Sequence, residues 1–242
     1  MVNRLDFTIK KNMHNLCREH GFVSRGQVFF RLRGDAVLQA ISFRYEHTFS
    51  HYALNIGLMS LFSEMDDVLL SSQSTLPRYS ICCLDNCPTA VSVVRNNGLV
   101  SFKVRSPEEQ LLLLSKYGFE WLDGVATQLE LLNAIDYLDR VSYKSKIWNN
   151  RLKLAPFLAV GDYNSADRVI ASILDQQLGP QSFSTPPWTE EDFLYYSTIF
   201  PNKNTELLCI HELIANKKDN AIKAYLDKEY HLNTDRLHFL EQ

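Results

Sequence analysis

The spacing of hydrophobic residues at the start of the chain predicts an amphipathic helix. Apolar side chains recur every three to four positions from Leu5 to Cys17, which is the spacing of one helix face. Gly21 follows as a C-cap, and Phe22 is expected to fold back on the helix. The pattern therefore predicts a helix over residues 4–20.

Three alternating runs then predict a β-hairpin and a third strand. The runs 28–32 and 37–45 are rich in β-forming residues, and Arg33-Gly34-Asp35 joins them with a glycine that can adopt a positive φ. Residues 52–59 show the clearest alternation in the chain and predict a central antiparallel strand. On the second strand, one face carries Gln39 together with the residues that are expected to enter the core: Val37, Ile41, Phe43 and Tyr45.

The pattern is weaker between the third strand and residue 105. The polar, serine-rich stretch 63–77 predicts a loop or a short irregular helix. Further strands are expected at 79–84, 90–95 and 99–105, and the turn Asn96-Asn97-Gly98 joins the last two as a hairpin.

The signal changes from β to α at residue 106. Ser106-Pro107-Glu108-Glu109 combines an N-cap serine, a proline at the first helical position and a glutamate three residues after the cap. Helices are expected at about 107–117, 124–140, 144–160, 165–177, 190–199, 205–216, 219–229 and 234–241. The sequence therefore predicts an α+β fold: an antiparallel sheet with helix cover over 1–105, followed by an all-α domain of repeat-like helical hairpins over 106–242.

A faint internal repeat runs through the helical part at an offset of 55 residues. Leu158 matches Leu213, and Ala166 matches Ala221, each pair lying on the two sides of a short turn. Gly161-Asp162-Tyr163 is similar to the turn of tetratricopeptide hairpins, but the spacing is too long for that repeat. Simple packing of helical hairpins accounts for the pattern equally well.

Composition places the chain among folded, cytoplasmic proteins. Of its 242 residues, 45% are hydrophobic and 22% are charged, which is ordinary globular usage. No apolar run approaches the ~18 residues of a membrane-spanning helix, and the first residues show no secretory signal. Five irregularly spaced cysteines fit a reducing compartment better than a disulfide framework.

Charge is distributed unevenly along the chain. Residues 1–105 carry 12 Lys and Arg against 8 Asp and Glu, whereas residues 106–242 carry 13 against 20. Neither half has the concentrated positive field that nucleic-acid binding needs. The acidic second half suits a basic protein partner, and attraction between the halves would explain the asymmetry as well.

The polar residues at the bend between the second and third strands are the only catalytic candidates. Arg44, Glu46, His47 and His51 could form an acid–base or phosphate-binding set, or they could lie in a solvated loop. The sequence contains no glycine-rich phosphate motif and no nucleophile elbow, so no cofactor is expected.

Two further sets of residues resemble metal motifs without completing them. Cys83 and Cys87 have knuckle-like spacing, but no second Cys/His pair lies at a matching spacing. Cys17 with His20 on the first helix could complete the set, but buried cysteines on a strand and turn are the simpler interpretation. His211-Glu212 begins a zinc-protease pattern, but position 215 is alanine where the second histidine must stand. No metal site is therefore predicted.

Arginines and aromatic residues are interleaved around the predicted hairpin. Such a face could stack the bases of a single-stranded nucleic acid, but the alternation places most of the aromatic rings in the core. A sheet face that docks a protein partner is favoured instead.

The first part of the chain resembles a bacterial family that is known only as a domain of unknown function. The resemblance covers residues 1–140 and is best over 1–60. Its motifs are Leu16 with Gly21-Phe22, Phe29-Phe30-Arg31, Gly34-Asp35, Leu38-Gln39 with Ile41 and Phe43, Leu54-Asn55-Ile56-Gly57 and Trp121-Leu122-Asp123. Small α+β proteins of this kind occur among bacterial toxin–immunity repertoires, so the resemblance implies by analogy an immunity-like binding role and no site residues.

Three functional hypotheses follow from the sequence. The first is a bacterial protein-binding module without catalytic activity, which neutralises a basic partner enzyme through its acidic helical surface. The second is an enzyme of unrecognised class that uses the loop with His47 and His51. The third is a helical scaffold for protein assembly with a concave groove over 144–241.

Overall fold

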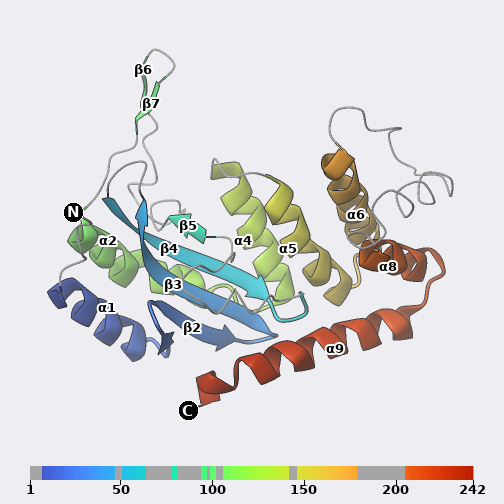
Figure 1. Cartoon of the computed structure of the whole chain (residues 1–242), viewed down its shortest axis with the longest axis horizontal. Helices are drawn as coiled ribbons and strands as arrows, with labels where there is room; N and C mark the ends of the chain where they lie inside the picture. Colours follow the sequence, from blue (N-terminus) through green and yellow to red (C-terminus); the bar gives the residue numbers. More distant parts are fainter. Residues whose placement is uncertain are drawn as a thin grey trace.

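The computed structural model has the α+β fold that the sequence predicts: an antiparallel sheet covered by helices and continued by helical hairpins (Figure 1). It describes residues 7–46, 51–63, 78–80, 94–96, 99–101, 106–141, 146–178 and 205–241.

Helix α1 (Phe7–Glu19) ends as its sequence predicts. It buries the apolar positions Ile9, Met13 and Cys17, which lie one turn apart on one face. Gly21 adopts a φ of 78°, and the amide of Phe22 donates to the carbonyl of Cys17 over 3.0 Å. This is a Schellman turn, and it folds the buried Phe22 back against the core.

The main sheet has five antiparallel strands in sequence order: β1 (Val23–Arg25), β2 (Val28–Arg33), β3 (Val37–Glu46), β4 (His51–Ser60) and β5 (Arg78–Ser80). The predicted hairpin and central strand are confirmed as β2, β3 and β4. The short strand β1 was not predicted. It forms because a turn at Gly26, whose φ is 63°, brings Val23 opposite Phe30. A separate hairpin pairs β6 (Val94–Asn96) with β7 (Leu99–Ser101).

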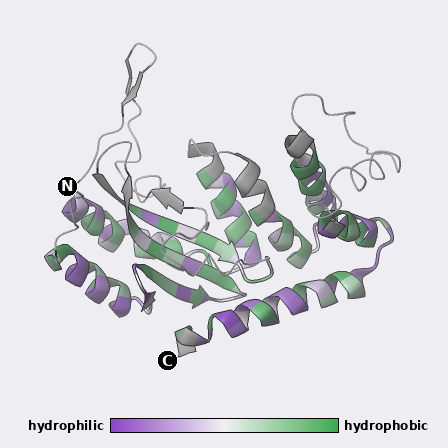
Figure 2. Ribbon diagram, viewed as in Figure 1, coloured by the Kyte–Doolittle hydropathy of each residue, from purple (hydrophilic) through white to green (hydrophobic). Residues whose placement is uncertain are grey.

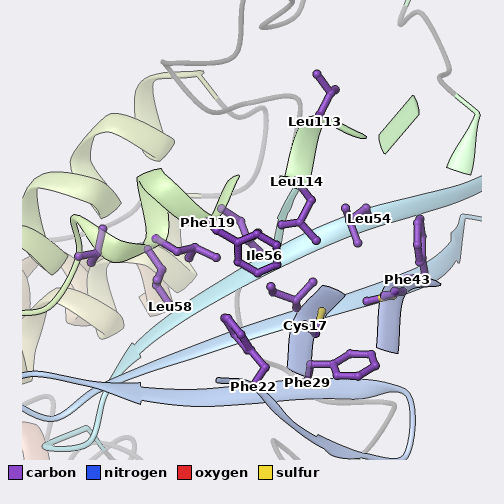
Figure 3. Close-up of a cluster of buried hydrophobic side chains, with 14 of the residues drawn as sticks. Cys17, Phe22, Phe29, Phe43, Leu54, Ile56, Leu58, Leu113, Leu114 and Phe119 are labelled. Atoms are coloured by element: carbon purple, nitrogen blue, oxygen red, sulfur yellow. The ribbon is translucent and has the colours of Figure 1, made fainter. Parts of the chain in front are cut away.

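Both faces of the sheet are buried, each in its own core. The face that carries Gln39 packs against α1 and the helices after residue 106 (Figure 3), and it contributes Phe29, Val37, Ile41, Phe43, Leu54, Ile56 and Leu58. The opposite face contributes Val28, Phe30, Leu38, Ala40, Met59 and Leu61 to a second layer with Leu237. Phe29 and Phe43 lie in the core on the expected face, whereas Phe30 lies in the second core on the opposite face.

The first helices after the sheet are α2 (Pro107–Leu113), the π-helical segment η4 (Leu114–Gly118), α3 (Phe119–Asp123) and α4 (Gln128–Val141). The predicted capping box is confirmed, since the amide of Glu109 donates to Ser106 Oγ and the amide of Ser106 donates to the Glu109 carboxylate. The helix was expected to end near residue 117. It continues to Asp123 because the π-helical turn redirects Phe119 and Leu122 into the sheet core.

These helices share one core with the sheet. Leu111, Leu114, Phe119 and Leu122 pack against residues of α1, β3 and β4. The first core therefore draws on residues from both sides of the expected boundary between 105 and 106, and the division into two domains stays a prediction.

The helical part consists of α5 (Lys146–Ala159), α6 (Tyr163–Leu178), α8 (Thr205–Ala215), α9 (Asp219–Arg236) and the short η5 (His238–Glu241). Its own core is formed by apolar residues of the four longer helices. The helix expected at 190–199 lies outside the described residues. An ion pair of 2.6 Å between Lys153 and Asp136 connects α5 to α4.

Helix α9 returns from the helical part to the sheet, and the C-terminus lies near β2 (Figure 1). The expected break between residues 229 and 234 is wrong, because α9 is continuous to Arg236. The buried amide of Asn233 donates to the carbonyls of Leu61 and Ser63, each over 2.7 Å. Although α9 is mostly hydrophilic (Figure 2), this contact and Leu237 dock its last turns on the second face of the sheet.

The internal repeat is present as two similar helix turns, with an offset of 56 residues in place of 55. Gly161, with a φ of 78°, ends α5, and Lys217, with a φ of 51°, ends α8. In both turns the next amide reaches back five residues, from Asp162 to Phe157 and from Lys218 to Leu213. The offset differs by one because these hydrogen bonds, and not the best letter matches, define the equivalent positions.

Replacing Lys217 with glycine is expected to stabilise the protein. A side chain in the left-handed region costs about 1 kcal/mol relative to glycine, and the equivalent position 161 is already glycine. The free energy of unfolding in urea should therefore rise by about 1 kcal/mol. Lys218→Gly is the matched control, because Lys218 has a φ of −90° and no strain to relieve. An equal gain in both variants would contradict the explanation.

No described helix is long and apolar enough to cross a membrane.

Candidate functional site

Three of the predicted catalytic residues, Arg44, Glu46 and His51, lie where β3 ends and β4 begins. The strand register places Glu46 directly opposite His51 and Arg44 opposite Ala53. His47 lies outside the described residues. The backbone therefore brings Glu46 and His51 together, and the acid–base role of the four residues stays a prediction.

The cysteines considered for metal binding fall into two groups. Cys83 and Cys87 lie outside the described residues. Cys17 is completely buried in the first core, and burial raises the pKa of its thiol to about 12. A thiol that stays protonated is a poor metal ligand, so Cys17 acts as a core residue. Among the described residues there is no cluster of three metal-ligating side chains.

His211, the first residue of the incomplete zinc-protease pattern, contacts a neighbouring helix. Its Nδ1 lies 2.5 Å from Asp167 Oδ1 on α6, so the pair connects α8 to α6. This contact joins two helices of the helical part.

A buried polar network lies between α1, the sheet and α3. Arg31 Nη2 and Nε donate to Gln39 Oε1 over 2.6 and 3.1 Å, and Nη1 donates to the carbonyl of His20 over 2.9 Å. The guanidinium also lies 4.5 Å from the centre of the Phe22 ring and 2.8 Å from Asp123 Oδ1. Burial lowers the pKa of Arg31, and the charge and hydrogen bond of Asp123 oppose this shift.

Gln39 completes the network on the side of the helices. It is fully buried, and its amide donates to the carbonyls of Leu122 and Val125 over 2.6 and 2.9 Å. The network therefore joins the end of α3 to β2 and β3. Because Arg31 and Gln39 have almost no exposure, these contacts hold the fold and do not form an open site.

A hollow of about 860 Å³ lies between the sheet and the helical part. It lies where the β2–β3 turn, the start of α4, the α5–α6 turn and the first half of α9 meet. The residues that line it are Gly34, Asp35, Ala36, Phe62, Gln128, Leu158, Ala159, Val160, Gly161, Tyr163, Asp219, Asn220, Ile222, Lys223, Leu226, Asp227 and Tyr230. We call this site the acidic hollow. Its size is within the range of ligand pockets.

The acidic hollow combines buried apolar residues with aromatic rings. Leu158, Ile222 and Leu226 are buried members of the helical core. Tyr163 and Tyr230 are partly exposed and present their rings to the hollow from α6 and α9. Such a surface can bury the apolar part of a ligand while polar groups around it determine orientation.

The charged side chains of the hollow are mostly negative. Asp35, Asp219 and Asp227 line it together with one cation, Lys223. Neither Asp35 nor Asp227 forms an ion pair with any residue that the structure describes. Tyr163 hydrogen-bonds to Asp219, and burial, followed by the negative charge of Asp219 and this hydrogen bond, raises the pKa of the phenol. The hollow therefore favours a positively charged ligand.

The start of α4 fixes one wall of the hollow. The amide of the buried Gln128 donates to the carbonyls of Asp35 and Ala36. Glu130 accepts from the backbone amides of Ala126 and Thr127, each over 2.9 Å, and these hydrogen bonds lower its pKa. The carbonyl oxygen of the Gln128 side chain is buried and accepts no hydrogen bond from the described part of the chain.

The sequence patterns do not predict this hollow, because its walls come from segments that lie far apart in the sequence. One local signal was present on α9, where Asp219, Lys223 and Asp227 recur every four residues beside the apolar stripe of Ile222 and Leu226. That pattern indicates a charged edge along a buried helix face. It does not indicate that the β2–β3 turn faces the same edge.

Comparison with known proteins gives no match, whether with family models, curated proteins or solved structures. The resemblance to the bacterial family therefore stays a prediction, and the functional argument rests on the site itself.

Proposed function

We propose that this chain is a cytoplasmic protein-binding module without catalytic activity, which binds a basic protein through the acidic hollow. The role is of the immunity-like kind, in which occupation of a partner enzyme's surface blocks that enzyme. The supporting observation is the open hollow with three carboxylates and one ammonium group over buried apolar residues.

The chemistry of the hollow suits a protein partner. Apolar and aromatic residues provide the area whose burial stabilises a complex, whereas charged residues around them select the partner and speed its encounter. Val160 adds an exposed apolar side chain beside the hollow, with 42% of its surface accessible. A basic segment with some apolar side chains would complement both features.

The position of the hollow favours binding over a purely helical scaffold. The scaffold hypothesis expected a groove formed by residues 144–241 alone. The hollow also uses Asp35 and Ala36 from the sheet and Gln128 from α4. A partner bound there would contact both parts of the chain at once.

A large side chain at the edge of the hollow is expected to weaken binding. Val160→Trp places a large side chain at its edge, and Leu232→Trp is the matched control on α9, because Leu232 is 43% exposed and does not line the hollow. The tagged wild-type chain would first recover the partner from extracts of the source organism, and the purified pair would then be titrated calorimetrically. We expect Val160→Trp to weaken binding at least ~10-fold, or about 1.4 kcal/mol, with no change for Leu232→Trp.

Two results would contradict the proposal. One is a wild-type chain that recovers no stoichiometric protein partner. The other is a recovered partner whose affinity is the same for both tryptophan variants, because that partner would bind elsewhere on the chain.

A further inference from the structure

We infer that the acidic hollow is a receptor for an arginine side chain, whose guanidinium is bound by Asp35 and Asp227. This inference rests on the proposed binding of a basic protein and specifies which basic residue occupies the site. The charge, the aromatic rings and the acceptor groups of the hollow support it separately.

The charge of the hollow is not neutralised within the protein. Asp35 and Asp227 are exposed and form no ion pair with the described residues, although Lys223 lines the same hollow. The net charge of the lining side chains is therefore negative. A cationic side chain that enters this partly enclosed space gains more from these carboxylates than it would on an open surface.

Tyr230 packs against neighbouring rings before any ligand binds. Its ring lies 5.7 Å from the ring of Phe62 and 5.7 Å from that of His231. Tyr163 lines the same hollow from α6, next to Asp219. Fixed aromatic rings next to carboxylates suit a planar guanidinium, which can stack on a ring while its N–H groups donate to the acids.

The number and spread of acceptors favour arginine over lysine. Two carboxylates without an ion pair among the described residues line the hollow from different elements, Asp35 from the β2–β3 turn and Asp227 from α9. Gln128 lines the same hollow, and its buried side-chain oxygen accepts no hydrogen bond from the described part of the chain. A guanidinium offers five donors in a fixed plane, whereas the ammonium of lysine offers three around one point.

The test uses short fluorescent peptides of alternating arginine and glycine, with lysine peptides of the same length for comparison. Binding to the full chain is followed by fluorescence anisotropy at ~50 mM and ~300 mM salt. We expect the arginine peptide to bind at least ~10-fold more tightly than the lysine peptide and to lose affinity at the higher salt concentration. Equal affinities of the two peptides would overturn the assignment of arginine.

Charge-matched variants locate the binding site. Asp35→Asn combined with Asp227→Asn should weaken binding of the arginine peptide at least ~10-fold. The control combines Glu120→Gln with Asp235→Asn, which changes the net charge equally at exposed positions outside the hollow, and it should bind as the wild type does. Equal weakening in both variants would overturn the inference, because attraction by overall charge would then explain the binding.

A third variant acts in the opposite direction. Lys223→Gln removes the cation of the hollow and should strengthen binding of the arginine peptide about 2- to 5-fold. Unchanged or weaker binding would contradict the inference. Because this variant gains affinity, loss of folding cannot produce the expected result.

The inference and the proposed function can fail separately. A natural partner that is lost with Val160→Trp but does not respond to the carboxylate variants would support the function and refute the arginine receptor. Specific peptide binding without any protein partner would support the receptor and refute the function.

Discussion

Replacing Gln39 with leucine is expected to destabilise the protein by about 3 to 5 kcal/mol, which is a large part of the stability of an ordinary domain. The substitution keeps the volume but removes the acceptor for Arg31 and the donor for two buried carbonyl groups, those of Leu122 and Val125. A buried charge that loses a partner and two carbonyls that each lose a donor carry a desolvation cost, although the Leu122 carbonyl still accepts from the amide of Val125 over 3.0 Å. Urea unfolding followed by circular dichroism would measure the loss.

Two comparison variants keep this prediction testable if the leucine variant does not fold. Gln39→Glu retains an acceptor for Arg31 but turns an oxygen toward the carbonyls of Leu122 and Val125, so its loss should be smaller in acid, where a protonated carboxyl can donate to one of them, than at neutral pH. Asp123→Asn removes a partner that is 44% exposed and should cost less than about 1 kcal/mol. Equal losses for Gln39→Leu and Asp123→Asn would show that Gln39 is not the centre of the network.

Replacing Gly34 with alanine is expected to cost about 2 to 5 kcal/mol, the sum of steric overlap and backbone strain. A Cβ at this position would lie 2.2 Å from the backbone oxygen of Ala126, and the φ of Gly34 is 42°. Neither group can move freely, because the amide of Asp35 donates to the same oxygen over 2.8 Å. The substitution should therefore separate the β2–β3 turn from the start of α4.

Gly26→Ala is the matched control for this prediction. Gly26 has a φ of 63°, yet a Cβ there would meet no atom within 4 Å. Its loss should be limited to the backbone strain of about 1 to 2 kcal/mol. Thermal unfolding of both variants would separate the cost of backbone strain from the cost of steric overlap with Ala126. Similar losses of stability in the two variants would mean that the overlap with Ala126 contributes nothing.

The sequence was sufficient for the elements whose signals are local. The Schellman turn at Gly21, the capping box at Ser106 and the alternation of β3 and β4 each depend on a few neighbouring residues, and all are confirmed. Gln39 was correctly placed on the core face. Its partners at Leu122 and Val125 could not be predicted, because the chain returns to them more than eighty residues later.

The errors also have physical reasons. The extension of the helix past residue 117 depends on a π-helical turn, which has no simple sequence pattern. The continuity of α9 depends on the contact of Asn233 with Leu61 and Ser63, which are 172 and 170 residues away in sequence. Tertiary contacts of this kind override the weak helix propensity of Asn233 and Thr234.

The candidate site also depends on contacts between residues that are distant in sequence. The excess of acidic residues after residue 105 indicates negative charge on the helices, and Asp219 and Asp227 of the hollow lie on α9. Asp35 comes from the half that is basic overall, so net charge alone could not place it in the same hollow. Only the packing of the β2–β3 turn beside α9 brings the three carboxylates together.

Hydrogen exchange of the full chain, with and without the arginine peptide, tests the central claim most directly, because every segment is observed at once. We expect exchange to slow at residues 34–36, 158–163 and 219–230, which line the acidic hollow. Slowing confined to other segments would contradict the account. In particular, protection centred on residues 44–51 would move the site to Arg44, Glu46, His47 and His51 and would favour the enzyme hypothesis.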